Sequence, residues 1–270
     1  MLKILKNIRN SFFLFAILLS GFSDLEAKNS KDVSNTEVKR KTTSHKKKYS
    51  LTLANSKDGH PVRSGKKSYR FEVRLGDCGK DSGHDDCKKD RQRTELQFKK
   101  HQMGKKDHWY SASIYLPENY QSVAPVRTTF AQLYEKGWKP ILMITDRSGE
   151  WLEVGRMWSG EYVEMKKAIR INDMRGKWTD VLVHANWSFN QDGFFKTWIN
   201  NELKFEYKGR TLFKTKRPYV YLKFGIYRSF MSRWRNQNNI QDVPGQVLYF
   251  DEVRVGKSKK EVVGKLPPLK

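Results

Sequence analysis

The segment at residues 219–228 carries residue types suited to chemistry on an anionic substrate. Its sequence, Tyr-Val-Tyr-Leu-Lys-Phe-Gly-Ile-Tyr-Arg, alternates with a period of two, which is typical of a strand with one buried face. The apolar residues at even positions form one face. The other face presents a cation, a glycine and phenols, including Lys223, Gly225 and Tyr227. We expect this second face to form the floor of a binding site.

Three further segments, 93–98, 129–134 and 181–186, place polar residues opposite an apolar face in the same way. If the four strands are neighbours, their polar side chains line one site. These side chains are Arg93, Glu95, Gln132, His184, Asn186, Lys223 and Tyr227.

The elements that must position these residues are predicted to be short antiparallel strands. The same alternation occurs in segments 109–116, 128–134, 178–187 and 247–255, with little helical periodicity between them. Asn200-Asn201 separates two further strand-like runs and is expected to form a hairpin turn, because asparagine tolerates positive φ. The pattern predicts an all-β fold, a jelly-roll sandwich with a concave substrate groove.

The N-terminal part of the chain is predicted to contain a signal peptide followed by a linker. Residues 1–27 combine early basic residues, an apolar run at 12–19 and a small-residue exit at Ala27, the layout of a signal peptide; an uncleaved anchor is the alternative. Residues 28–50 are basic and polar, which predicts a flexible linker. The remainder, residues 51–270, is expected to form one domain. A secreted or periplasmic location follows.

The two cysteines of the chain, Cys78 and Cys87, lie in a loop rich in glycine and aspartate. Export favours oxidation, so a disulfide that closes this loop is predicted. The alternative is a metal site in which both thiolates act with His84, although zinc normally requires four ligands.

The formal net charge is +24, which favours an acidic polymer as partner, because clustered cations raise the local concentration of a polyanion. A nucleic-acid binder would explain the charge equally well. The signal peptide, the disulfide and the lack of a recognised nucleic-acid module argue against it. We expect a monomer that binds an acidic polymer and does not insert into membranes once the signal is removed.

Three motifs give the chain a family resemblance. Arg-Thr-Glu-Leu at 93–96, Ala-Gln-Leu at 131–133 and Tyr-Leu-Lys-Phe-Gly-Ile-Tyr at 221–227 resemble, in order and spacing, the signature strands of jelly-roll polysaccharide lyases. The similarity covers most of residues 60–256. It is to the heparin lyase I and glucuronan lyase group and, more distantly, to alginate lyases of the same fold. The resemblance implies β-elimination: a base removes the proton beside a uronic carboxylate, and the C4 oxygen leaves an unsaturated sugar behind.

That reaction requires cations and amide donors around the carboxyl group, where negative charge develops. It also requires a base and an acid that titrate usefully. Some relatives use a histidine two residues after the glutamine, but Tyr134 stands there. Tyr227 is therefore the first candidate for both acid and base, and His184 is the second. The catalytic candidates are Tyr227, His184, Lys223 and Gln132. The substrate-binding candidates are Arg93, Asn186, Tyr134, Tyr221, Glu95 and Arg228.

Several alternatives stay open at this point. Arg93 and Glu95 could form a solvated cross-strand pair, and we expect Glu95 chiefly to orient the arginine. His184 could be a surface histidine. No cofactor is expected to be required; some relatives hold a structural calcium, for which Asp251 is the candidate ligand. The alternative function is a noncatalytic secreted protein that binds acidic polysaccharides, because a jelly roll can host either activity.

Overall fold

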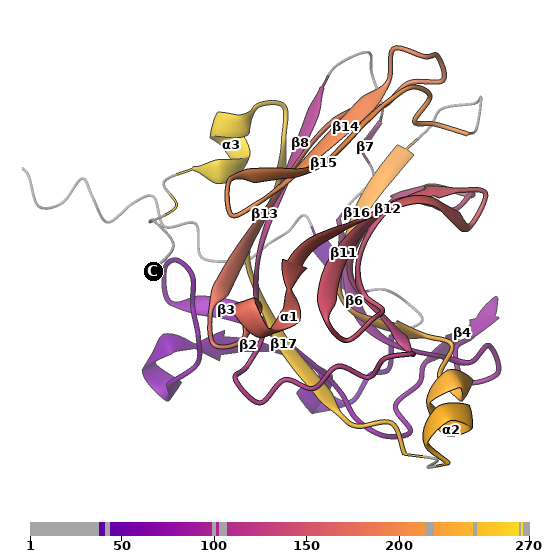
Figure 1. The fold of residues 1–270 in the computed structure, drawn as a ribbon. Helices are drawn as coiled ribbons and strands as arrows, with labels where there is room; N and C mark the ends of the chain where they lie inside the picture. The colour runs from indigo at the N-terminus through magenta and orange to yellow at the C-terminus, as the bar shows by residue number, and fades with distance from the viewer. Residues whose placement is uncertain are drawn as a thin grey trace, which may run out of the picture. The chain divides into compact units, whose positions relative to one another are not determined.

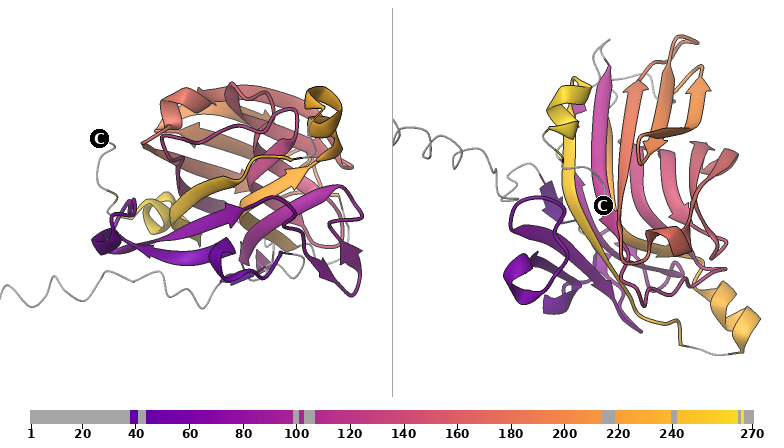
Figure 2. Two further views of the ribbon diagram at one scale, coloured as in Figure 1. Left: turned by 90° about the horizontal axis from the view of Figure 1, so that it is seen from below. Right: turned by 60° about the vertical axis from the view of Figure 1, so that its left-hand side comes forward.

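The computed structural model describes residues 38–40, 44–98, 101–102, 107–213, 219–239, 242–264 and 266. All of them belong to one compact unit, Asn35–Lys270. Most of the described residues lie in two large antiparallel sheets, which form separate layers (Figures 1 and 2). The prediction of an all-β sandwich is therefore confirmed.

One sheet has eight strands and carries the segment at 219–228. Its order is β1 (Val38–Arg40), β6 (Arg91–Phe98), β16 (Tyr219–Ser229), β9 (Arg127–Glu135), β10 (Pro140–Asp146), β11 (Trp151–Trp158) and β12 (Glu161–Arg170), and β7 (His101–Gln102) pairs with β16.

The other sheet has seven strands. Its order is β15 (Glu202–Lys208), β14 (Phe194–Ile199), β13 (Trp178–Asn186), β8 (His108–Tyr115), β17 (Gln246–Gly256), β3 (Lys67–Val73) and β2 (Leu51–Asn55). The remaining elements are short: the paired strands β4 (Lys80–Asp81) and β5 (His84–Asp85), the helices α1 (Ile171–Met174), α2 (Ser232–Asn238) and α3 (Lys259–Val263), and the 3₁₀ turns η1 (Lys48–Ser50) and η2 (Ser56–Asp58).

The core lies between the two sheets and is rich in aromatic residues. Phe224 of β16 contacts Phe71 of β3 and Phe250 of β17, with ring centroids 5.8 Å and 5.3 Å apart. All three rings are fully buried. Because alternate residues of a strand point to opposite faces, burial of Phe224 directs its neighbour Lys223 away from the core. The eight-stranded sheet curves, and Figure 1 shows its concave side facing away from the seven-stranded sheet.

The hairpin prediction is confirmed at residues 200 and 201. Asn200 and Asn201 have φ of 50° and 68° and join β14 to β15, with Ile199 paired to Glu202. Two positive φ values in a two-residue loop match the twist of the strands on either side.

Part of the predicted linker belongs to the folded unit, which corrects the boundary expected at residue 51. Strand β1 pairs with β6, and Val38 lies opposite Phe98. Further along, Ser44 and His45 are buried against β6, where the Ser44 hydroxyl accepts a hydrogen bond of 3.0 Å from the Glu95 amide. Pairing along a sheet edge uses backbone groups, so a basic, polar composition did not reveal it. Residues 1–37, with the predicted signal peptide, lie outside the described residues.

No helix within the described ranges is both long and apolar enough to cross a membrane.

Gly225 occupies a position in β16 that only glycine accepts without strain. Its φ is +132°, and the register against β9 shifts between Phe224 and Tyr227. A Cβ added there would lie 2.3 Å from the Thr94 carbonyl oxygen and 2.8 Å from the Phe71 ring. The backbone is therefore kinked between the two polar residues that the strand presents.

We expect Gly225→Ala to lower the free energy of unfolding by roughly 2–4 kcal/mol, because strained backbone and overpacking add. Urea unfolding measures this. The matched control is Gly83→Ala, where an added Cβ meets nothing within 4 Å. Equal unfolding midpoints for the two variants would contradict the steric argument.

Candidate active site

Strand β16 lies between β6 and β9, and the three strands bring most of the predicted residues together. Lys223 is opposite Gln132 of β9, and Tyr227 is opposite Arg93 of β6. We call the side of these strands that faces away from the core the polar face. The predicted residues on it are Arg93, Glu95, Gln132, Tyr134, Tyr221, Lys223 and Tyr227.

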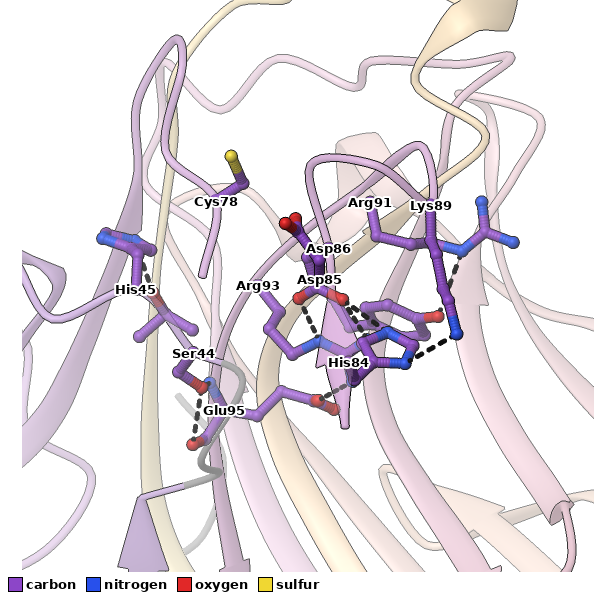
Figure 3. A network of polar contacts seen from close by, with 12 residues as sticks. Ser44, His45, Cys78, His84, Asp85, Asp86, Lys89, Arg91, Arg93 and Glu95 are labelled. Carbon is purple, nitrogen blue, oxygen red and sulfur yellow. Dashed lines mark hydrogen bonds and ion pairs between the residues drawn. The ribbon is translucent and has the colours of Figure 1, made fainter. Parts of the chain in front are cut away.

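A buried ionic network organises the polar face (Figure 3). Arg93 donates from Nε and Nη2 to the two oxygens of Asp86, at 2.6 and 2.7 Å, and from Nη1 to Glu95 Oε2 at 3.3 Å. Gln132 Nε2 donates to the other oxygen of Glu95 at 2.7 Å. Asp86 and Glu95 are 0% and 1% exposed. The solvated Arg–Glu pair is thus the wrong alternative, and Glu95 orients both Arg93 and Gln132.

The charge of Arg93 is secured by its partners. Burial lowers the pKa of Arg93, whereas the carboxylates of Glu95 and Asp86 raise it, and the net shift is upward. With three donors committed to these carboxylates, Arg93 chiefly shapes the site around it. Its guanidinium carbon lies 4.1 Å from the centroid of the Tyr227 ring and so fixes the position of that ring.

Cations also contact the phenols of the polar face. Arg91 Nε donates to the Tyr227 oxygen at 3.2 Å. Lys223 Nζ lies 3.6 Å from the centroid of the Tyr134 ring. Burial, followed by the nearby Tyr227, raises the pKa of Tyr134. Tyr134 therefore keeps its proton more firmly than an ordinary tyrosine, and positive charge is concentrated near Tyr227.

His84 joins this network from outside the sheet, whereas the sequence suggested for it only a role as a ligand in the alternative metal site. Its Nε2 lies 3.0 Å from Asp86 Oδ1, and Lys89 Nζ lies 3.3 Å from its Nδ1. Figure 3 shows His84 beside Arg93, below the loop that carries Asp86. One feature of the sequence could have indicated this contact. The loop between the two cysteines directly precedes the strand of Arg93, and a loop closed by a disulfide folds back over the adjacent strand.

The predicted disulfide is present. Cys78 and Cys87 are bonded, with their Cα atoms 5.4 Å apart. The zinc alternative is wrong for this form, because both sulfurs are used in the bond. The Asp86 amide donates to the Gly79 carbonyl at 3.0 Å, and the Arg91 amide donates to the Asp86 carbonyl at 2.8 Å. The loop that carries His84 and Asp86 is therefore fixed at its base.

His184 and Asn186 do not lie with the other predicted residues, so their placement in the site was wrong. Both are on β13 of the seven-stranded sheet. The His184 ring stacks on Trp109 at 4.0 Å, and its Nε2 lies 2.8 Å from Asp107 Oδ2. Alternation correctly put them opposite the core side of β13. It could not tell which sheet contains β13, and the outer face of this sheet points away from the polar face.

The prediction that Arg228 binds substrate was also wrong, because its side chain is buried. It is 0% exposed and lies on the core side of β16, where it donates to side-chain oxygens of Gln246 and Gln92 and to the Pro244 carbonyl. Burial lowers its pKa to about 10. Its even position in the alternating segment already indicated the core face.

Asp251 uses its carboxylate to hold backbone amides, which leaves the calcium suggestion without support. The carboxylate accepts hydrogen bonds from the amides of Arg63, Ser64 and Glu252 at 2.8, 3.1 and 2.8 Å. Within the described ranges, no group of three or more histidine, cysteine, aspartate or glutamate residues could hold a metal ion.

Burial raises the pKa of Asp251 to about 6, compared with about 3.9 for an unfolded aspartate. Between these values the folded protein retains a proton that the unfolded chain has released. Its contribution to stability is therefore present below about pH 4 and lost as the pH rises through 6. Relative to Asp251→Asn, we expect wild-type stability to fall on the order of 2 kcal/mol from pH 4 to pH 7. Urea unfolding across this range checks it, and a pH-independent difference would contradict it.

Phenols, cations and an amide are therefore gathered on the side of the curved eight-stranded sheet that faces away from the core. A family model described as polysaccharide lyase matches residues 30–254, and the chain belongs to this family. The predicted enzyme class, a lyase that cleaves a polysaccharide by β-elimination, is therefore confirmed. No curated protein matches the sequence.

Solved structures confirm the jelly-roll fold. An endo-β-1,4-glucuronan lyase from the fungus Trichoderma reesei is similar over 84% of this chain and 98% of its own, with 17% identity and a TM-score of 0.59. The family 7 alginate lyase A1-II′, solved as a variant with substrate, is similar over 82% of this chain and 93% of its own, with 13% identity and a TM-score of 0.53. At such low sequence identities, these similarities show a shared fold and do not extend to the substrate.

Proposed function

We propose that this lyase cleaves a uronate-containing polysaccharide at the polar face, with Tyr227 as the acid that protonates the leaving oxygen. The observation that carries the proposal is the joint position of Tyr227, Gln132 and Lys223 beside the Asp86–Arg93–Glu95 network. Glucuronan and alginate are the polymers on which the structurally similar lyases act by name. Polyuronates of these kinds are the first substrates to test.

In this proposal, Lys223 and Gln132 bind the uronic carboxylate. Negative charge moves onto that group when the neighbouring carbon loses its proton, so fixed donors there lower the barrier. The two residues lie directly opposite each other on β16 and β9. Gln132 has one donor hydrogen held by Glu95, which orients the amide and leaves its second hydrogen for the substrate.

We assign the base to His84, with Asp86 as its orienting partner. A carboxylate that accepts from one ring nitrogen fixes the imidazole and stabilises its protonated form. Lys89, exposed and bound to the other nitrogen, would have to leave when substrate arrives. Arg91 stabilises the negative charge that Tyr227 acquires when it gives its proton to the glycosidic oxygen. In the net reaction the C–H bond beside the carboxylate and the C4–O bond break, and a C=C bond forms between the two carbons. His84 gains the proton from carbon, and Tyr227 gives its own proton to the leaving oxygen.

The test is to incubate the purified protein with polyglucuronate, alginate and heparin-like polymers. Ultraviolet absorbance then records the conjugated double bond of the unsaturated product. We expect absorbance to rise with at least one polymer, and the His84→Ala variant to lose most of that rate while His184→Ala keeps it. Binding without any rise in absorbance would favour the noncatalytic alternative. Full activity in His84→Ala would remove His84 and leave Tyr227 to serve as both base and acid.

We also propose that the protein is exported and acts as a monomer. Support comes from the signal-like layout of residues 1–27 and from the disulfide, which is typical of oxidising compartments. Residues 28–37 then remain as a polar linker before the folded unit. Mass spectrometry of the protein recovered from culture medium tests cleavage after Ala27, and light scattering tests the monomer.

A further inference from the structure

Three arginines surround one aromatic ring where β16 ends. The guanidinium carbons of Arg91, Arg127 and Arg233 lie 4.3, 4.8 and 4.2 Å from the centroid of the Phe230 ring. They come from β6, β9 and α2. Like charges gathered around one ring repel one another, and an anion bound between them would relieve that repulsion.

Among the described residues, the cluster has no carboxylate paired with it. In the part of the chain that the structure describes, none of these three arginines forms an ion pair with a carboxylate. Arg93, which lies on the same face, has two carboxylates. Arg127 donates only to a neutral hydroxyl, that of Ser229, at 3.1 Å. The cluster therefore keeps unneutralised positive charge on a surface that already binds an anionic chain in the proposed function.

The cluster continues the polar face beyond Tyr227. Ser229 is paired with Arg91 on one side and Arg127 on the other. It lies two residues beyond Tyr227 on β16, about 7 Å along the strand. Arg91 also contacts the Tyr227 oxygen. A polymer whose scissile bond lies at Tyr227 would therefore reach the arginines with the adjoining part of the chain.

There is space beside Arg91 of the cluster, and the backbone at Phe230 is strained. A pocket of about 520 Å³ lies between the disulfide and α2, and Arg91, Arg235 and Lys88 are among the residues that line it. Asp90 lines it too; its carboxylate accepts hydrogen bonds from the Ser232 amide and hydroxyl and lies 3.9 Å from Arg235 Nη2, so it offsets the charge of Arg235. Phe230 has a φ of +67°, which is unfavourable for a bulky residue and is typical of functional sites.

We propose that Arg91, Arg127 and Arg233 form a subsite for an oxyanion, a sulfate ester or a carboxylate, on the sugar next to the uronate that is cleaved. The planar guanidinium groups match the geometry of such oxyanions. The inference rests on the proposed function, since it names a second group of the same substrate that the site recognises. Arg127 and Arg233 do not touch the reacting groups, so they set affinity and not the chemical step.

The experiment compares wild type with the Arg127→Ala/Arg233→Ala double variant. Polyglucuronate and sulfated and desulfated heparin-like oligosaccharides are the probes, and calorimetry measures binding. The control is Lys57→Ala/Lys257→Ala, which removes the same charge from exposed positions on η2 and after β17. We expect the double variant to bind at least roughly tenfold more weakly, the scale of one charge-assisted hydrogen bond, with kcat unchanged on any polymer that is cleaved.

The probes separate the two sources of the oxyanion. A loss confined to sulfated chains identifies a sulfate, and an equal loss on polyglucuronate identifies a carboxylate. Binding of every probe at the level of the control variant would overturn the subsite. If no polymer is cleaved but the arginines still set affinity, the proposed function fails while the subsite stands.

Discussion

Tyr227→Phe is expected to lower kcat about a thousandfold, the scale of general acid–base catalysis, with little change in KM. The substitution removes only the oxygen that Arg91 contacts. The ring, stacked against the Arg93 guanidinium, remains. Substrate binding through Lys223 and Gln132 should persist because their positions do not depend on that oxygen.

Steady-state kinetics on the best polyuronate measure this effect, and circular dichroism confirms the fold. The matched control is Tyr219→Phe, the same change on the same strand, which we expect to alter kcat less than twofold. If Tyr227→Phe were as active as Tyr219→Phe, the proton would have to come from another group, and the assignment of Tyr227 would be abandoned.

Asp86→Asn is expected to lower the free energy of unfolding by about 3 kcal/mol, at the lower end of the cost of breaking a buried ion pair. Asp86 is fully buried and receives two hydrogen bonds from Arg93. An asparagine offers one oxygen and turns an amide toward the remaining guanidinium hydrogens. Glu95 still neutralises part of the Arg93 charge in this variant, since it also pairs with Arg93.

The same substitution should reduce activity, because His84 loses the carboxylate that orients it. Asp85→Asn is the control, since that neighbouring side chain accepts a backbone hydrogen bond from Lys88 and takes no part in the network. Urea unfolding at neutral pH gives both free energies. A difference below about 0.5 kcal/mol between the two variants, the usual range for surface changes, would mean that the network contributes little to stability.

The network also explains why a small loop matters for this site. His84 and Asp86 come from a segment with only short strands, β4 and β5, and the disulfide at its ends fixes where it returns to the sheet. Burying the Asp86 carboxylate beneath a loop would be costly unless a cation paired with it. Arg93 meets that need from β6, so the loop and the strand determine each other's position.

The sequence alone determined the local features of this protein. Alternation in β16 assigned Lys223 and Tyr227 to the face away from the core, because successive side chains of a strand point to opposite sides. The same rule placed Gln132, Arg93 and Glu95 correctly on their strands. Applied to Arg228, the rule would have placed this residue on the core side, but its charge led to the wrong prediction that it binds substrate.

Only the tertiary structure decided which strands are neighbours and what lies above them. His184 follows the same alternation as Gln132, yet β13 pairs with β8 and β14 in the other sheet. Sheet pairing uses backbone hydrogen bonds between segments far apart in sequence, which side-chain patterns barely encode. Likewise, the contact of His84 and Asp86 with the polar face depends on the path of a loop, and no periodicity describes such a path. The sequence therefore predicted which polar side chains of β6, β9 and β16 face away from the core. The packing of the two sheets and the path of the cysteine loop decided which residues they contact.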